Sequence, residues 1–142
     1  MAQSARESLD RLVGGDHGVL STLHPERGVD AVPVVYALSP DGFVGIPVDR
    51  VKPKSSTRLQ RVRNLEHDPR ATLLVDHWDA DDWTRLWWVR AGLLWDVDPP
   101  AEVEEALAAL LADKYAQYAD RPFERVLVFS LTGVSGWSAS VS

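Results

Sequence analysis

The sequence predicts a mainly β protein, an antiparallel barrel that is closed or partly split and carries helices at its periphery. Three observations support this fold class. The chain has about six segments with strand patterns but only about three with helical spacing. Short turns, rather than crossover helices, join most of the strands, which disfavours a parallel doubly wound sheet. The length of 142 residues suits a single domain, residues 1–142, with one continuous core.

The first half of the chain is expected to contain one helix followed by three strands. Apolar residues at helical spacing predict a helix over 4–13, which Gly14 and Gly15 end. The strands are expected at 17–23, 29–38 and 43–48. Pro33 removes a backbone donor, so its strand should lie at an edge, at a bulge or against a ligand. The turn sequence SPDG that follows predicts that the second and third strands pair as a hairpin.

The second half is expected to contain two helices and three strands. A T-x-x-Q capping box of Thr57 and Gln60 predicts a helix that runs to about His67 and stops at the following Asp-Pro. An apolar stripe predicts a helix over 101–118. The strands are expected at 71–76, at 84–96 with a bend at Gly92, and at 125–131. Residues 132–142 are polar, contain glycine and lie outside these strands.

Composition excludes several classes of protein. The chain is 45% hydrophobic and 25% charged, which is ordinary for a soluble globular protein. No apolar run approaches a membrane span, and the polar N-terminus does not resemble a signal peptide, so a cytoplasmic location is expected. The absence of cysteine excludes disulfides, thiolate metal sites and cysteine nucleophiles. A net charge of −6 argues against general nucleic-acid binding.

A basic run stands out in this acidic chain. Residues 50–63, RVKPKSSTRLQRVR, contain six of the fifteen Lys and Arg residues and no acidic residue. Such a segment repels itself unless an anion or an acidic partner surface lies against it. The capping box places a helix N-terminus inside the run, and a helix N-terminus favours phosphate. The sequence therefore predicts a phosphate-bearing ligand.

Other chemical sites find little support. The acidic residues from Asp76 to Asp82 match no ordered series of metal ligands and are expected to form an exposed turn, so no metal site is predicted. His17, His24 and His67 lie near the ends of elements, where capping or surface positions are expected. No serine-hydrolase motif, Walker A loop or dinucleotide fingerprint occurs. Four tryptophans crowd into residues 78–88, which suits core packing, a dimer interface or a ligand wall.

Two segments carry a resemblance to a known family. GVLSTLHPERGVDAVPVVYAL (18–38) and RVRNLEHDPRATLLVD (61–76) resemble the FMN-binding split β-barrels related to pyridoxamine 5'-phosphate oxidase. The arrangement PVDRVKPK…RLWWVRAG is most similar to the actinobacterial branch that uses the deazaflavin coenzyme F420. The resemblance covers nearly the whole chain. It implies an antiparallel split β-barrel of the FMN-binding type and an obligate homodimer with two cofactor sites at its interface.

The resemblance also implies which residues bind the cofactor. Arg61 matches the basic residue that grips the cofactor phosphate, and it would be joined there by Lys52, Lys54 and Arg58. The family's backbone lines the isoalloxazine ring at positions that match Val34, Pro47, Val48 and Asp49. Further residues approach the ring, in part from the second subunit, at positions that match Trp87 and Trp137.

The expected function is an oxidoreductase that binds F420 and transfers a hydride between it and a small organic substrate. The cofactor carries this reaction, so no catalytic residue is assigned to the protein. The chain ends in GWSASVS and lacks the family's arginine-rich substrate motif, which disfavours oxidation of vitamin B6. Three alternatives remain: the same barrel with FMN, a non-catalytic F420 or flavin binder, and a single-strand nucleic-acid barrel, which the net charge disfavours.

Overall fold

The computed structural model describes residues 1–49 and 59–140. Within these ranges the chain forms a seven-stranded sheet with three α-helices and two short 3-10 helices. The strands are β1 Gly18–His24, β2 Gly28–Val34, β3 Ala37–Leu38, β4 Phe43–Asp49, β5 Arg70–His77, β6 Trp87–Asp96 and β7 Phe123–Ser138. The helices are α1 Ala5–Gly14, α2 Gln60–His67 and α3 Ala101–Lys114, and the 3-10 helices are η1 Trp83–Arg85 and η2 Ala116–Tyr118.

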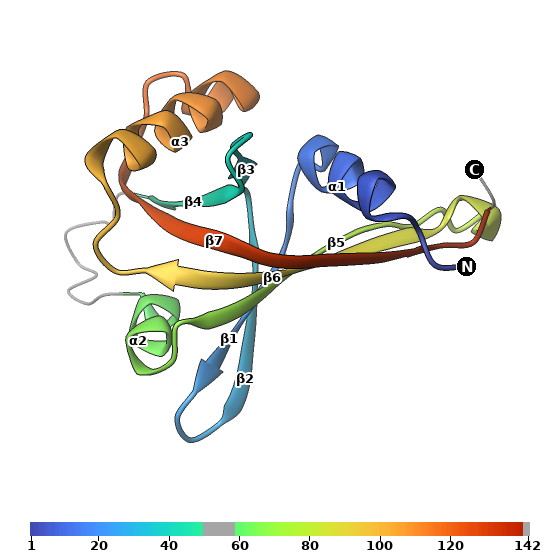
Figure 1. Cartoon of the computed structure of the whole chain (residues 1–142), viewed down its shortest axis with the longest axis horizontal. Helices are drawn as coiled ribbons and strands as arrows, with labels where there is room; N and C mark the ends of the chain where they lie inside the picture. The colour runs from blue at the N-terminus through green and yellow to red at the C-terminus, as the bar shows by residue number, and fades with distance from the viewer. Residues whose placement is uncertain (50–58, 141–142) are drawn as a thin grey trace.

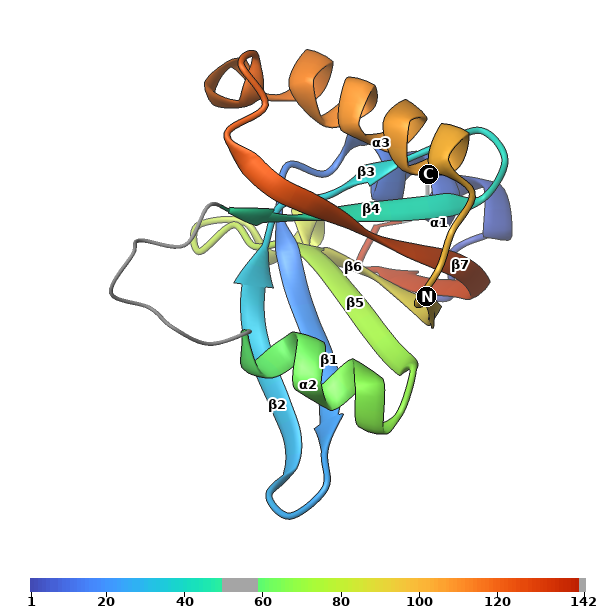
Figure 2. The same ribbon diagram turned by 90° about the vertical axis from the view of Figure 1, so that its left-hand side faces the viewer.

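The order of the strands explains how the sheet curls. It runs β2-β1-β5-β6-β7-β4-β3, and every neighbouring pair is antiparallel. β2 and β3 are consecutive in the chain, yet they lie at opposite edges of the sheet. The chain therefore crosses from one edge to the other over Val35 and Tyr36, and the twisted sheet wraps into a partly split barrel (Figures 1 and 2). The predicted antiparallel barrel with peripheral helices is confirmed.

Two clusters of buried apolar side chains hold the elements together. The larger lies inside the curled sheet and includes Leu20, Ile46 and Phe129, all completely buried. The smaller lies between α3 and the β3–β4 side of the sheet and includes Leu107 and Leu111. Figure 2 shows α3 lying along β3 and β4, while α2 lies beside β1 and β2. Each fully buried leucine side chain stabilises this arrangement by about 1.5–3 kcal/mol.

The C-terminal strand differs most from the sequence prediction. β7 runs from Phe123 to Ser138, not over 125–131, because its second half pairs with β6 as far as the Ser138–Trp87 pair. Of the two glycines in this half, Gly136 is needed for close packing and does not mark a loop. A Cβ on Gly136 would lie 2.5 Å from the Ser8 hydroxyl oxygen in α1. The close approach of α1 therefore accounts for a pattern that looked polar and irregular in the sequence.

Several predicted boundaries also shift. The expected strand over 29–38 divides into β2 and β3, because the buried Tyr36 turns the chain from one edge to the other. The expected strand start at Thr84 is occupied by η1, which Asp82 caps by accepting a hydrogen bond from the Thr84 amide. The last helix ends at Lys114, and η2 follows it.

The start of α2 needs a separate correction. A capping box would place Gln60 three residues after the N-cap. In the structure Leu59 is the N-cap, and Gln60 is the first residue of α2. The Gln60 side chain bonds within the helix, donating to Asn64 Oδ1 at 2.8 Å and accepting from Arg63 at 2.5 Å. The predicted partner, Thr57, lies outside the described residues.

Other local predictions are confirmed. Pro33 lies in β2, at one edge of the sheet. β3 and β4 pair as the predicted hairpin. At Gly92 the register shifts, because Gly92 pairs with Gly133 while Leu93 pairs with Leu131. Among the helices of residues 1–49 and 59–140, none is long and apolar enough to cross a membrane.

Candidate functional site

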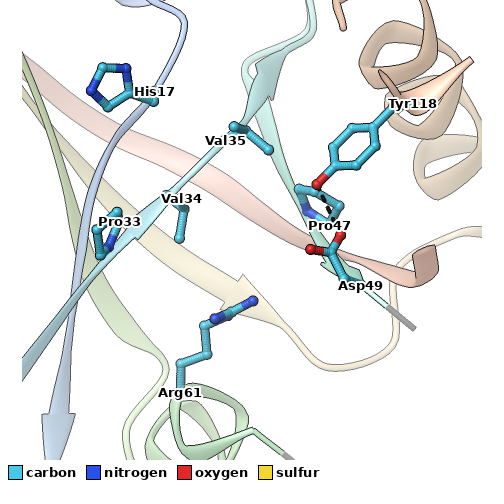
Figure 3. Close-up of a pocket in the computed structure, with 8 residues that line it drawn as sticks. All are labelled: His17, Pro33, Val34, Val35, Pro47, Asp49, Arg61 and Tyr118. Carbon is cyan, nitrogen blue, oxygen red and sulfur yellow. Dashed lines mark hydrogen bonds between the residues drawn. The ribbon is translucent and has the colours of Figure 1, made fainter. Parts of the chain in front are cut away.

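A cavity of about 260 Å³ opens where the ends of β2 and β4 meet α2 and η2. Eight residues line it (Figure 3): His17, Pro33, Val34, Val35, Pro47, Asp49, Arg61 and Tyr118. Four of these were predicted site residues: Val34, Pro47, Asp49 and Arg61. We call this cavity the Arg61 pocket. The fold thus brings together residues that lie far apart in the chain.

Strand alternation decides which residues of β4 reach the Arg61 pocket. Side chains along a strand alternate between its two faces, so Pro47 and Asp49 line the pocket while Val48 points into the core and is only 4% exposed. The pairing of β4 with β7 shifts register between Val48 and Asp49, which ends the regular ladder at the pocket. The exposed Asp49 therefore stands at the end of a buried strand.

Arg61 is the cation of the pocket. Its side chain extends from the second residue of α2 into the cavity (Figure 3), and its buried Nε has no hydrogen-bond partner within the described part of the chain. Burial lowers the pKa of Arg61, while the nearby Asp49 carboxylate acts in the opposite direction. A guanidinium nevertheless stays protonated at physiological pH. A half-buried, unpaired cation of this kind is stabilised by a bound anion.

Tyr118 and Asp49 form a hydrogen-bonded pair opposite Arg61. The Tyr118 hydroxyl donates to Asp49 Oδ1 at 2.9 Å. Burial, helped by this hydrogen bond, raises the pKa of Tyr118 to about 12. The hydroxyl therefore stays protonated and remains a donor. Tyr118 was predicted to belong to the apolar stripe of a helix, and no local pattern links it to Asp49, which lies far away in the sequence.

A buried polar network fixes α2 against the barrel. Asn64 is completely buried, and its Nδ2 donates to Thr22 Oγ1 at 3.0 Å and to Asp30 Oδ2 at 2.9 Å. Asp30 also accepts two hydrogen bonds from Arg27. The hydrogen bond from Asn64, followed by those from Arg27, lowers the pKa of Asp30. Because Asn64 follows Arg61 by one helical turn, this network holds in place the part of α2 that carries Arg61.

His17 stands at another side of the pocket and was predicted to be a surface or capping residue. It is exposed, and its Nδ1 lies 2.6 Å from Asp16 Oδ1. The hydrogen bond with His17 lowers the pKa of Asp16. His17 thus combines a surface position with a place on the wall of the cavity.

Among the other predicted site residues that the structure describes, neither Trp87 nor Trp137 lines the Arg61 pocket. Trp87 stacks on His77, with ring centroids 6.1 Å apart, and Arg11 lies 5.0 Å from its ring. Trp137 pairs with Trp88 in the β6–β7 ladder. Trp87 lines a second cavity of about 320 Å³, together with Leu74, Asp76, Trp78, Leu86, Trp88 and Arg90. The predicted phosphate ligands Lys52, Lys54 and Arg58 lie outside the described residues.

Comparison with solved structures supports the fold. No protein-family model and no curated protein matches the sequence. A FAD-binding protein from Mesorhizobium loti is 17% identical with a TM-score of 0.67, over 96% of this chain and 95% of that one. An FMN-binding protein from Syntrophomonas wolfei is 18% identical with a TM-score of 0.66, over 94% of this chain and 88% of that one.

A third similar structure is the heme storage protein HutZ from Vibrio cholerae. It is 11% identical with a TM-score of 0.66, over 93% of this chain and 94% of that one. These identities are low, so the likeness concerns the fold. The chain has the split-barrel fold that these flavin-binding and heme-binding proteins share, as the sequence predicted.

Proposed function

We propose that the Arg61 pocket binds the phosphate end of a flavin-type cofactor. The observation that carries this proposal is the half-buried guanidinium of Arg61 beside a cavity, whose Nε has no hydrogen-bond partner among residues 1–49 and 59–140. An arginine binds phosphate through two parallel hydrogen bonds, a geometry that a solvated surface lysine does not provide. FMN is the first candidate, because similar structures bind FMN and FAD. Coenzyme F420 is the second, on the resemblance of the sequence.

The residues of the pocket fit part of such a cofactor. Arg61 suits the phosphate, and the apolar side chains of Pro33, Val34 and Pro47 suit the flat face of a ring. The volume of about 260 Å³ falls below the roughly 300–1,000 Å³ of typical small-molecule sites. The rest of the cofactor would therefore extend beyond this pocket. We propose that a second copy of the chain completes the site, with Trp87 and Trp137 as the predicted contributors.

A bound flavin or deazaflavin would supply hydride transfer to or from a small organic substrate. The part assigned to this chain is to hold and orient the cofactor: Arg61 fixes its charged end, and the Asn64 network fixes the helix that carries Arg61. An oxidoreductase and a non-catalytic cofactor carrier would share this binding site. They differ in turnover, which an assay with reduced cofactor and candidate substrates measures.

Titration of the purified full-length protein with FMN and F420, followed by fluorescence, tests the proposal. Arg61→Ala should weaken binding of the preferred cofactor by about 10- to 150-fold, because a hydrogen bond to a charged group contributes about 1.5–3 kcal/mol. Arg63→Ala is the matched control: Arg63 is exposed on the same helix, it bonds to Gln60, and it does not line the pocket. We expect less than about a threefold change for this variant.

Two results would contradict the proposal. One is an equal loss of cofactor affinity in the Arg61→Ala and Arg63→Ala variants, which would mean that the effect comes from the net charge of the protein and not from a site at Arg61. The other is the absence of binding to both cofactors. Hemin belongs in the same titration because HutZ shares the fold. If added hemin gives a Soret band while neither FMN nor F420 binds, the ligand is heme and not the proposed cofactor.

A further inference from the structure

An acidic side chain lies in the pocket that we assign to a phosphate. Asp49 and Arg61 both line the cavity, yet they form no ion pair within the described part of the chain. A phosphate held by Arg61 would therefore meet the negative charge of Asp49, and like charges at close range repel. A pocket built only for phosphate would not place a carboxylate there.

The geometry of Asp49 indicates what it can bind. Its Oδ1 accepts the Tyr118 hydroxyl, whereas no partner is found for Oδ2 among residues 1–49 and 59–140. In Figure 3 this second oxygen points toward the side of the pocket where Val34 and Arg61 lie. A carboxylate only accepts hydrogen bonds, so a ligand group beside Oδ2 must be a donor. Tyr118 holds the carboxylate in place, because its protonated hydroxyl donates to Oδ1.

We propose that Asp49 determines the specificity of this pocket by accepting a hydrogen bond from a hydroxyl or N–H group of the ligand. This inference rests on the proposed function and refines it. Arg61 would select an anionic group, and Asp49 would require a donor on the same ligand. The ligand class is then a phosphate-bearing molecule with a hydroxylated chain or a ring N–H. Sulfate and other anions that carry no hydrogen-bond donor satisfy Arg61 but are repelled by Asp49.

The test compares FMN with sulfate as ligands of the purified protein. FMN carries hydroxyl groups and a phosphate, whereas sulfate has the negative charge but no hydrogen-bond donor. The preference is the ratio of the sulfate dissociation constant to that of FMN, both measured by calorimetry at one ionic strength. Asp49→Ala should lower this ratio at least about tenfold, because FMN loses a hydrogen bond to a charged acceptor, whereas the relief of charge repulsion is common to both ligands. Sulfate alone should bind more tightly to this variant.

Two further variants sharpen the result. Glu26→Ala removes one negative charge from the exposed β1–β2 turn, away from the pocket, and should leave the ratio within about twofold. Tyr118→Phe keeps the charge of Asp49 but releases its Oδ1. We expect this variant to bind FMN more weakly and to leave sulfate binding unchanged. Circular dichroism checks that each variant is folded.

The outcomes separate this inference from the proposed function. If Arg61→Ala weakens binding of both FMN and sulfate but Asp49→Ala leaves their ratio unchanged, the specificity role of Asp49 is wrong and the phosphate site stands. If Asp49→Ala weakens sulfate binding, the residue supports the anion site instead of selecting against anions without a donor, which also overturns the inference. If neither FMN nor sulfate binds, both proposals fail together.

Discussion

Replacing Asn64 with alanine should destabilise the protein by about 2–5 kcal/mol. The completely buried side chain donates to Thr22 and accepts from Gln60, at 3.0 and 2.8 Å. Each neutral hydrogen bond contributes about 0.5–1.5 kcal/mol, and a Thr22 hydroxyl left without a partner costs about 1–3 kcal/mol, because Thr22 is itself only 3% exposed. The higher helix propensity of alanine offsets roughly 0.5 kcal/mol of this loss. The bond to Asp30 adds to the effect.

Urea unfolding followed by tryptophan fluorescence measures this effect. With a slope of about 2 kcal/mol/M, the midpoint should fall by roughly 1–2.5 M while the slope stays the same. His67→Ala, at the exposed end of the same helix, is the control and should change stability by less than about 0.5 kcal/mol. A midpoint shift for Asn64→Ala no larger than that of the control would refute the reasoning. It would mean that α2 is held by its apolar face alone.

The Asn64 network can also be separated from simple loss of packing. Thr22→Val keeps the shape of the side chain but removes the hydroxyl. If the hydrogen bond carries the effect, the double variant should be less destabilised than the two single changes predict, by about 1 kcal/mol. Additive changes would show that the two side chains act independently.

Two further predictions concern packing and acid stability. Gly45→Ala should destabilise the protein by about 1–3 kcal/mol in thermal unfolding, because the added Cβ would lie 2.8 Å from Leu107 Cβ in α3. Gly133→Ala is its control, because a Cβ at that position meets no atom within 4 Å. Hydrogen bonds from Arg70 lower the pKa of Asp68 to about 2, whereas an aspartate in the unfolded chain has a pKa of about 3.9. The stability that this carboxylate contributes is therefore present above pH 4 and is lost as the pH falls toward 2. Asp68→Asn should therefore flatten the fall of Tm between pH 4 and pH 2, and an unchanged slope would contradict the role of Asp68.

The sequence predicted those parts of the fold that depend on local patterns. Apolar alternation and turn residues located most of the strands, and Pro33 marked an edge. The second half of β7 was missed, because Gly136 is required by contact with α1, an element that lies more than a hundred residues earlier. The start of α2 was placed too early, because a capping motif reflects only local hydrogen bonds. The tertiary hydrogen bonds of Asn64, which hold this helix against the barrel, leave no local pattern in the sequence.

The candidate site was predictable only where one segment carries its chemistry. The basic run and the resemblance pointed to Arg61, and the neighbouring strands to Val34, Pro47 and Asp49. Tyr118 could not be found in this way, because its spacing suits the apolar stripe of the helix predicted over 101–118. Only the folded chain, in which Tyr118 ends η2, places its hydroxyl beside Asp49.

The position of the Arg61 pocket follows from how the barrel closes. β2 and β4 are not hydrogen-bonded neighbours in the sheet, yet Val34 and Val35 lie across the same cavity from Pro47 and Asp49. A closed ladder would fill this gap with backbone hydrogen bonds and leave no room for a ligand. Tyr36 is completely buried at the crossing, and its hydroxyl donates to the Leu12 carbonyl, which anchors the crossing segment to α1. Packing of Tyr36 in the core therefore accompanies the separation of β2 from β4, and α2 places Arg61 at the cavity between these two strands.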